Sequence, residues 1–213
     1  MITALMFGGA FNPPTIAHIE LADFARTAVG AEYVIFVPTK NAYIADEQHK
    51  SYVFSDTQRL AMLERIAGRH PWMLVSHYEI DSEAQPRTYQ TLCHLKEEGY
   101  QCRLLMGSDK LPELEHGWKF VEQITQEFGI VCMERSEDDV AEILKNDAYL
   151  STLIPYIQVL PTPAKTRHVS STAVRKLLSE IQASYIQLKT MVPTEISETL
   201  IQCVLEDETC ETE

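Results

Sequence analysis

A histidine preceded by glycines and prolines stands near the start of the chain, in a segment whose residue types suit phosphate. Residues 8–18 read Gly-Gly-Ala-Phe-Asn-Pro-Pro-Thr-Ile-Ala-His. Glycine lets a backbone approach a ligand closely, and the two prolines enforce an extended path, after which Thr15 is a natural N-cap for a helix beginning at Ile16. His18 then lies in the first helical turn, among unpaired N–H groups, where its ring can donate to a phosphoryl oxygen. A threonine and a histidine at this spacing alone indicate a cap and a packing residue, but the glycines and prolines favour a phosphate site.

A second helix start, near the other end of the chain, is rich in hydroxyl groups. It reads Val-Ser-Ser-Thr-Ala-Val-Arg and ends at Arg175. With Ser170 or Ser171 as the N-cap, free N–H groups, hydroxyls and one guanidinium converge on one point, which is the composition of a polyphosphate cradle. The plainer interpretation is an ordinary serine cap with a solvated arginine. Lys165 and Arg167 just upstream add positive charge and favour the cradle.

Short apolar runs alternate with amphipathic stretches along the chain, which predicts an α/β fold of the Rossmann-like, doubly wound class with a parallel sheet. We expect strands at Thr3–Phe7, Tyr33–Pro38, Met73–Ser76, Arg103–Met106, Gly129–Met133 and Ile157–Leu160. We expect helices at about 16–28, 56–69, 88–98, 117–126 and 137–146, and a wholly helical chain from Ser170 to about Cys203. A buried strand followed by Gly-Gly is where such a sheet presents its backbone to a ligand.

Length and composition predict one soluble, cytoplasmic domain over residues 1–213, with a helical part at about 170–205 and a disordered tail at 206–213. The long polar segment 41–55 is expected to be a loop over the carboxyl ends of the strands. A net charge of −13 argues against nucleic acid or an anionic membrane as the main partner. The five cysteines show no metal-ligand spacing, so we expect reduced thiols and no metal site built from the protein alone.

The two motifs, in this order, resemble the nucleotidyltransferase superfamily, whose members carry an (H/T)xGH signature near the N-terminus and an ISSTxxR signature near the C-terminus. Within it the chain resembles the nicotinate or nicotinamide mononucleotide adenylyltransferases from residue 3 to about 178. Leu105–Asp109, followed by Trp118, resembles the G-[AS]-D…W segment of that family, and Thr88–Leu92 resembles its T-x-x-T-L helix start.

The chain departs from the pattern of the family at several positions. Ala17 replaces the usual glycine, and Thr15 replaces the usual first histidine, so only His18 carries over as the catalytic imidazole. Asn12 stands where aspartate is common. No Pro-Pro-His-Lys segment follows Pro38, so Lys40 or Lys50 would have to supply its lysine.

The resemblance implies that the mononucleotide phosphate attacks the α-phosphorus of ATP and releases pyrophosphate, a step of NAD biosynthesis, with Mg²⁺ as the cofactor. His18 and Arg175 are implied to be catalytic. The residues implied to contact ATP are Gly8, Gly9, Ala10, Phe11, Thr15, His18, Gly107, Asp109, Ser170, Ser171, Thr172 and Arg175. The residues implied to contact the mononucleotide are Asn12, Lys40, Thr88 and Trp118. The alternatives are a helix N-cap for Asp109 and core packing for Trp118.

Other functions remain open at this stage. One is adenylyl or cytidylyl transfer to another phosphate, such as phosphopantetheine. Another is a nucleotide-binding module without catalysis, which the Ala17 departure keeps open. Nicotinate is favoured over nicotinamide mononucleotide because the layout resembles that of bacterial enzymes. The oligomeric state is not readable from the sequence, and a homo-oligomer stays among the options.

Overall fold

The computed structural model describes residues 1–41, 54–134, 139–163, 169–179 and 185–200. A parallel sheet of six strands runs through it in the order β3-β2-β1-β4-β5-β6. The strands are β1 Ile2–Gly9, β2 Tyr33–Pro38, β3 Met73–Val75, β4 Tyr100–Gly107, β5 Ile130–Glu134 and β6 Ile157–Pro161. Every predicted strand is present, and the predicted Rossmann-like class is confirmed. Most of the expected 41–55 loop and the expected tail at 206–213 lie outside the described residues.

The longer helices begin where their caps predict. The helices are α1 Ile16–Val29, α3 Asp56–Ala67, α4 Tyr78–Asp81, α5 Thr88–Glu97, α6 Val121–Gln123, α7 Val140–Asn146, α8 Ala148–Leu153, α9 Ser171–Leu178 and α10 Tyr185–Lys189. A 3-10 helix covers Ser108–Glu113, and a π-helical turn covers Ile124–Phe128. The short helices α4 and α8 were not predicted, because one or two turns are too short to show a hydrophobic period.

Two helix predictions were wrong in part. The helix expected at 117–126 begins only at Val121, because Phe120 has a left-handed backbone with φ of 64°. The region expected to be wholly helical from Ser170 breaks at Thr190–Pro193 before a further helical stretch at 194–200. Pro193 explains this break, since proline lacks the N–H that a helix interior needs.

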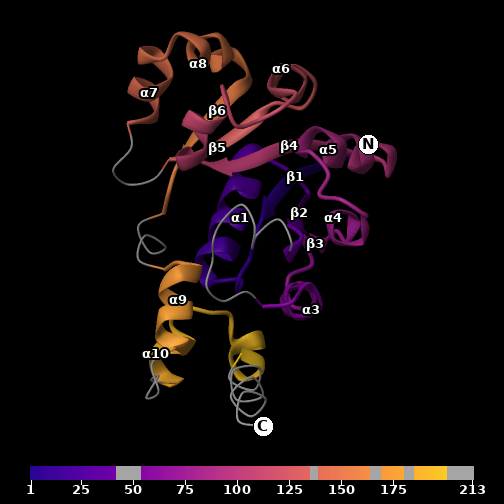
Figure 1. Ribbon diagram of the computed structural model, residues 1–213, viewed down its shortest axis with the longest axis vertical. Helices are drawn as coiled ribbons and strands as arrows, with labels where there is room; N and C mark the ends of the chain where they lie inside the picture. The colour runs from indigo at the N-terminus through magenta and orange to yellow at the C-terminus, as the bar shows by residue number, and fades with distance from the viewer. Residues whose placement is uncertain (42–53, 135–138, 164–168, 180–184, 201–213) are drawn as a thin grey trace.

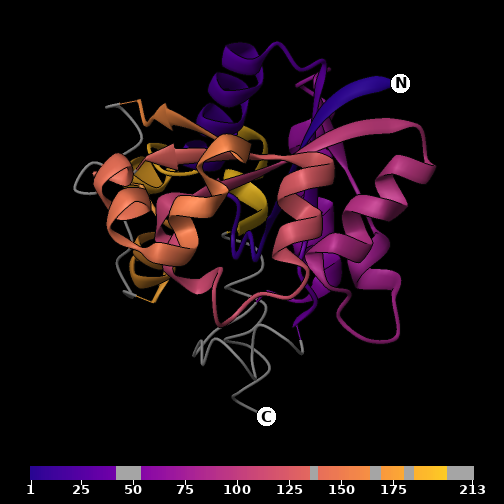
Figure 2. The same ribbon diagram turned by 90° about the horizontal axis from the view of Figure 1, so that it is seen from above.

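Alternate residues of each strand face two separate cores. In β2, Val34 and Phe36 pack with α1 and α3, whereas Ile35 and Val37 pack with α5. Val174 and Leu177 of α9 join the first core, and α7 and α8 join the second. Figures 1 and 2 show helices on both sides of the sheet, with α9 and α10 at the opposite end of the molecule from α7 and α8.

The strand order fixes where a ligand crevice is expected. From β1 the chain moves outward through β2 to β3, and then crosses back to β4 on the other side of β1. The crevice of a doubly wound sheet lies at this switch point, outside the carboxyl ends of the strands. Gly8 and Gly9 end β1, and Gly107 ends β4. These glycines therefore border the expected crevice, with Gly9 opposite Pro38 of β2.

Candidate active site

The start of α1 is held by a reciprocal cap between Thr15 and His18. The Thr15 hydroxyl accepts the His18 backbone N–H at 3.4 Å, and the ring Nδ1 of His18 accepts the Thr15 backbone N–H at 3.0 Å. The hydroxyl of Thr15 also lies 2.8 Å from this Nδ1. Because Nδ1 accepts, the neutral ring carries its proton on Nε2, which is then the nitrogen that can donate to a ligand.

The ring of His18 is also fixed by aromatic neighbours. Its centroid lies 5.2 Å from that of Phe11 and 6.1 Å from that of Phe7. Phe11 is buried and Thr15 is fully buried, whereas His18 is half-buried. The imidazole is thus held by the cap at Nδ1 and packed near two aromatic rings, which preorganises it for a single orientation.

The second motif docks directly on the first. Nη1 of Arg175 donates to the carbonyl of Asn12 at 2.7 Å, and the Ser171 hydroxyl donates to the carbonyl of Pro13 at 2.8 Å. These pairs join residues 163 and 158 positions apart in the chain. The two helix starts that the sequence suggested as halves of one site are therefore in contact.

Within the second motif, Ser170 is the N-cap of α9, and its hydroxyl accepts the Ala173 N–H at 3.1 Å. Thr172 accepts from Nη2 of Arg175 at 3.1 Å. Burial lowers the pKa of the Arg175 guanidinium from its ordinary value. Such a group still carries its charge at neutral pH, because the ordinary pKa of arginine lies far above neutrality.

The segment after β4 carries the next group of predicted site residues. Asp109 is exposed and lies in the first turn of the 3-10 helix, whose cap position is Gly107, so Asp109 is not the helix N-cap. Trp118 is half-buried and packs against the core of the α5 side. Trp118 therefore packs against the core with part of its side chain, as the alternative interpretation predicted, and keeps another part exposed.

The residues predicted for the mononucleotide come from separate segments of the fold. Asn12 is fully buried, and its side-chain oxygen accepts the Phe54 N–H at 3.0 Å. Thr88 is half-buried and is the first residue of α5. The structure thus gives Asn12 a contact that joins the turn after β1 to the start of α3.

Lys40 uses its ammonium group inside the protein. Nζ donates to the carbonyl of Ile80 at 2.5 Å and also to the carbonyl of Ser82, at the end of α4. Its backbone N–H donates to the side chain of Gln85 at 2.9 Å. Lys40 therefore holds the chain after β2 against the α4 segment.

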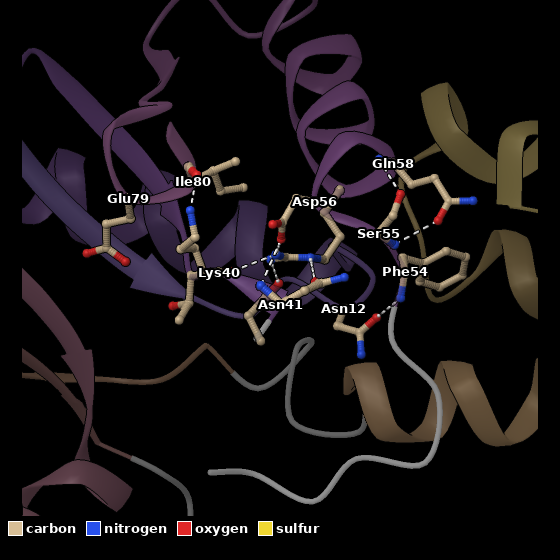
Figure 3. A network of polar contacts seen from close by, with 12 residues as sticks. Asn12, Lys40, Asn41, Phe54, Ser55, Asp56, Gln58, Glu79 and Ile80 are labelled. Atoms are coloured by element: carbon tan, nitrogen blue, oxygen red, sulfur yellow. Dashed lines mark hydrogen bonds and ion pairs between the residues drawn. The ribbon is translucent and has the colours of Figure 1, made fainter. Parts of the chain in front are cut away.

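Arg59 of α3 is a buried polar residue next to the candidate site, and the sequence analysis missed it. It is fully buried, and it donates to the carbonyls of Ala10 at 2.6 Å and Thr39 at 2.5 Å. It also donates to the side chains of Asn41 at 3.1 Å and Asp56 at 2.5 Å. Figure 3 shows Asn41, Asp56 and Lys40 together in this network.

A signal for Arg59 was present in the sequence. The buried residues of α3 are Arg59, Met62, Leu63 and Ile66, so a charged side chain stands on the apolar face of an amphipathic helix. Burial lowers the pKa of Arg59, and the hydrogen bond and charge of Asp56 oppose this shift. A charge in that position has to be paired inside the protein.

Glu79 is a second missed residue. It is 5% exposed, and its carboxylate accepts from the Thr91 hydroxyl at 2.8 Å and from the Gln85 amide at 2.5 Å. Burial raises the pKa of this carboxyl, while the two hydrogen bonds partly offset the shift. Since Gln85 also accepts the Lys40 N–H, Glu79 supports the chain after β2 through one intermediate.

Two cavities are lined by residues outside the predicted site. A cavity of about 620 Å³ is bordered by β3, α4 and α5, and Tyr78 and His94 stack at 3.9 Å in its wall. A smaller one of about 460 Å³ lies between α9 and α10, beside Lys176 and Met191. None of the predicted site residues lines either cavity, so the candidate site is defined by the two helix starts.

Comparison with known proteins agrees with the geometry. The sequence model of a family described as cytidylyltransferase-like matches residues 6–177. A Mycoplasma pneumoniae protein named probable nicotinate-nucleotide adenylyltransferase/Ap4A hydrolase is 32% identical over 203 residues, and the match covers 93% of this chain and 57% of the relative. An Aquifex aeolicus protein named probable nicotinate-nucleotide adenylyltransferase is 36% identical over 133 residues, which cover 62% of this chain and 76% of the relative.

Solved structures share the fold at low sequence identity. A Plasmodium falciparum nicotinic acid mononucleotide adenylyltransferase complexed with NaAD aligns with a TM-score of 0.70 at 17% identity, covering 97% of this chain and 96% of the other. A second structure of a protein with that name, complexed with APC, aligns with a TM-score of 0.72. At this identity the likeness concerns the fold.

Proposed function

The chain belongs to the cytidylyltransferase-like family, and we propose that it transfers AMP from ATP to nicotinate mononucleotide, releasing pyrophosphate, in the synthesis of NAD. A cytoplasmic location is part of this proposal. Among the described ranges, no helix is long and apolar enough to cross a membrane.

The docking of α9 on the start of α1 is the observation that carries the proposal. Arg175 and Ser171 meet the carbonyls of Asn12 and Pro13, immediately before the helix that carries His18. This contact joins the start of α9, with its guanidinium and serine hydroxyls, to the turn that precedes the helix of His18. Such a group of donors suits a triphosphate, since each favours negative charge.

The chemistry asks mainly for positioning and charge neutralisation. The mononucleotide phosphate is already an anion, so the reaction needs no general base. His18 donates from Nε2 to an oxygen on the α-phosphate, where negative charge develops. Arg175 and the α9 N-terminus, with Ser170 and Ser171, hold the β- and γ-phosphates, and the glycines that end β1 let the nucleotide approach the backbone.

Mg²⁺ enters this proposal as part of the substrate MgATP. Over the residues that the structure describes, no group of three or more His, Cys, Asp or Glu side chains gathers at a single point. Magnesium bound to a nucleotide does not need such a cage, because phosphate oxygens and water supply most of its ligands. The ion would shield the phosphate charge that an acidic chain of net charge −13 cannot shield alone.

For the acceptor half we propose two kinds of residue. Thr88, at the start of α5, and the exposed part of Trp118 contact the mononucleotide. Asn12 and Lys40 shape the site through the segments they bind, since both side chains contact backbone groups of the protein. Asp109, exposed after β4, accepts from ribose hydroxyls of the ATP.

Pyrophosphate release across a panel of acceptors tests the proposal. The purified chain is given ATP and Mg²⁺ with nicotinate mononucleotide, nicotinamide mononucleotide, phosphopantetheine or no acceptor, and CTP replaces ATP in a parallel series. We expect the highest kcat/KM with ATP and nicotinate mononucleotide. A preference for phosphopantetheine or for CTP would move the chain to another branch of the family, and nucleotide binding without any turnover would indicate a module without catalysis.

A further inference from the structure

We propose that Arg59 is a positioning residue that keeps the ATP end and the acceptor end of the site in register. This inference rests on the proposed function. Arg59 does not belong to either sequence motif and lies on α3, whose other buried residues are apolar. Its four hydrogen-bond partners lie on three separate segments of the chain.

Arg59 makes its hydrogen bonds just beyond the point where the pairing between β1 and β2 ends. The ladder between β1 and β2 runs as far as Gly9 opposite Pro38, and the Thr39 N–H makes a last bond to the Gly9 carbonyl at 3.0 Å. Beyond this point one segment leads from Ala10 to His18 and the other leads from Thr39 to Asn41. Arg59 donates to the Ala10 carbonyl on the first segment and to the Thr39 carbonyl on the second.

The second segment is held from its other side as well. The Lys40 N–H donates to Gln85, which is itself held by Glu79, and the Lys40 ammonium donates to the end of α4. Asn41 contributes its side chain to Arg59 and its N–H to Asp56 at 2.8 Å. Figure 3 shows the contact of Lys40 with Ile80 beside those of Asn41 and Asp56, with the Asn12–Phe54 bond next to them.

The buried guanidinium of Arg59 contributes more to the relative positions of its partners than to the free energy of unfolding. Its partner Asp56 keeps 30% of its side chain exposed, and the cost of removing the Arg59 charge from water offsets most of what the pair contributes. Five N–H donors in a rigid planar fork can nevertheless bind four acceptors at fixed angles, which the flexible ammonium of lysine cannot do. In-line attack depends on such alignment, because a misplacement of about 1 Å can cost roughly 10²-fold in rate.

The test compares Arg59→Lys with Arg65→Lys, a matched change on the same helix. Arg65 donates to the Thr199 hydroxyl at 3.0 Å in an exposed position. For Arg59→Lys we expect kcat to fall about tenfold or more, with the KM for each substrate within about threefold, because both subsites persist but lose alignment. Arg65→Lys should match the wild type in kcat, and hydrogen exchange at Lys40 should be faster in Arg59→Lys alone.

Two results would overturn the role of Arg59. One is a folded Arg59→Lys protein with a lower Tm but with wild-type kcat well below that Tm, which would make the residue a stabilising one only. The other is unchanged exchange at Lys40. Hydrogen exchange does not depend on turnover. A wild-type chain that releases no pyrophosphate would therefore contradict the proposed function, while exchange at Lys40 would still show whether Arg59 holds this segment.

A second variant covers the case in which Arg59→Lys does not fold. Asn41→Ala removes one acceptor of Arg59 and keeps the backbone bond from residue 41 to Asp56, so no charge is left unpaired. We expect a fall in kcat of about threefold with faster exchange at Lys40, in line with the loss of one modest hydrogen bond. A wild-type kcat in this variant, measured on folded protein, would count against the proposal.

Discussion

The helix starts at Thr15 and at Ser170 meet in one site but are built in opposite ways. At the start of α1, Thr15 is fully buried and satisfies its own helix together with His18, three residues away. At the start of α9, Ser170 is exposed and caps its helix, while Ser171 and Arg175 reach across to the other motif. The start of α1 is therefore held by contacts within its own helix. The start of α9 joins the candidate site only through its tertiary contacts with Asn12 and Pro13.

This difference suggests separate roles for the two helix starts in the proposed reaction. The α1 start sets the tautomer of His18, the donor in the proposed reaction, because the cap holds Nδ1 as an acceptor. The α9 start adds positive charge and joins the ends of the chain. We therefore expect changes at the first start to affect turnover, and changes at the second to affect nucleotide binding more evenly.

The largest effect is expected from His18→Asn. The asparagine side chain can accept the Thr15 N–H in place of Nδ1, so the cap survives while the Nε2 donor is lost. We expect kcat to fall about 10²–10³-fold, which corresponds to roughly 2.7–4 kcal/mol for one transition-state donor. Steady-state pyrophosphate release measures the fall, and thermal unfolding checks that the Tm stays close to that of the wild type.

His18→Gln provides a matched change, since a glutamine at the third position of a helix can close the same cap. The Gln58 side chain does so in α3, where it accepts the Ser55 N–H at 2.8 Å. We therefore expect His18→Gln to keep a Tm close to that of the wild type and to lose turnover, as His18→Asn does. A wild-type kcat in His18→Gln would show that the cap, and not the imidazole donor, is what His18 contributes to the reaction.

The next effect is expected from Arg175→Lys. Lysine keeps the charge but cannot bind the Asn12 carbonyl and the Thr172 hydroxyl together as the guanidinium does. We expect kcat/KM for ATP to fall about 10–100-fold, or roughly 1.4–2.7 kcal/mol, with part of the loss in KM. Lys176→Ala, at the exposed neighbouring position, is the control and should leave kcat/KM unchanged.

A smaller effect is expected on the free energy of unfolding when either N-cap residue is replaced by alanine. Thr15→Ala should cost about 2 kcal/mol and Ser170→Ala about 0.5–1 kcal/mol, the upper and lower parts of the range for a lost N-cap, because Thr15 is buried and Ser170 is exposed. For a chain of this size, each kcal/mol lowers the Tm by about 2–4 °C. Equal losses in the two variants would show that the α1 start is no more dependent on its cap than the α9 start.

The smallest effect concerns Glu79 and pH. Its pKa is raised in the folded state, so the folded protein binds more protons than the unfolded one between the ordinary and the raised pKa. The contribution of this group to stability is therefore fully present below the ordinary pKa and is lost as the pH rises through the raised pKa. The Tm of the wild type should therefore fall as the pH rises through this range, and Glu79→Gln should reduce that fall. A wild-type and a variant curve that run parallel across this range would contradict the assignment.

What the sequence could predict follows the same division between local and tertiary structure. The cap at Thr15 and the strand Tyr33–Pro38 were readable because propensity and pattern act over a few neighbouring residues. The bond from Arg175 to Asn12 was not predicted, because its partner is a backbone carbonyl far along the chain.

Arg59 and Lys40 show where sequence reasoning ends. A guanidinium on an apolar helix face predicts a buried partner, but the sequence does not say that two of the partners are the carbonyls of Ala10 and Thr39. The family resemblance implied that Lys40 contacts the mononucleotide, and the structure directs its ammonium to the end of α4. Backbone acceptors carry no residue identity, so bonds to them have no sequence pattern.

Label transfer tests the central claim most directly. The wild-type chain and His18→Asn are each incubated with Mg²⁺, nicotinate mononucleotide and ATP that is labelled in its α-phosphate. We predict that the wild type moves the label into a dinucleotide, with one pyrophosphate released for each dinucleotide formed, and that His18→Asn does so about 10²–10³-fold more slowly. A wild-type protein that binds ATP and leaves the label there, or a His18→Asn protein that transfers it at the wild-type rate, would contradict this account.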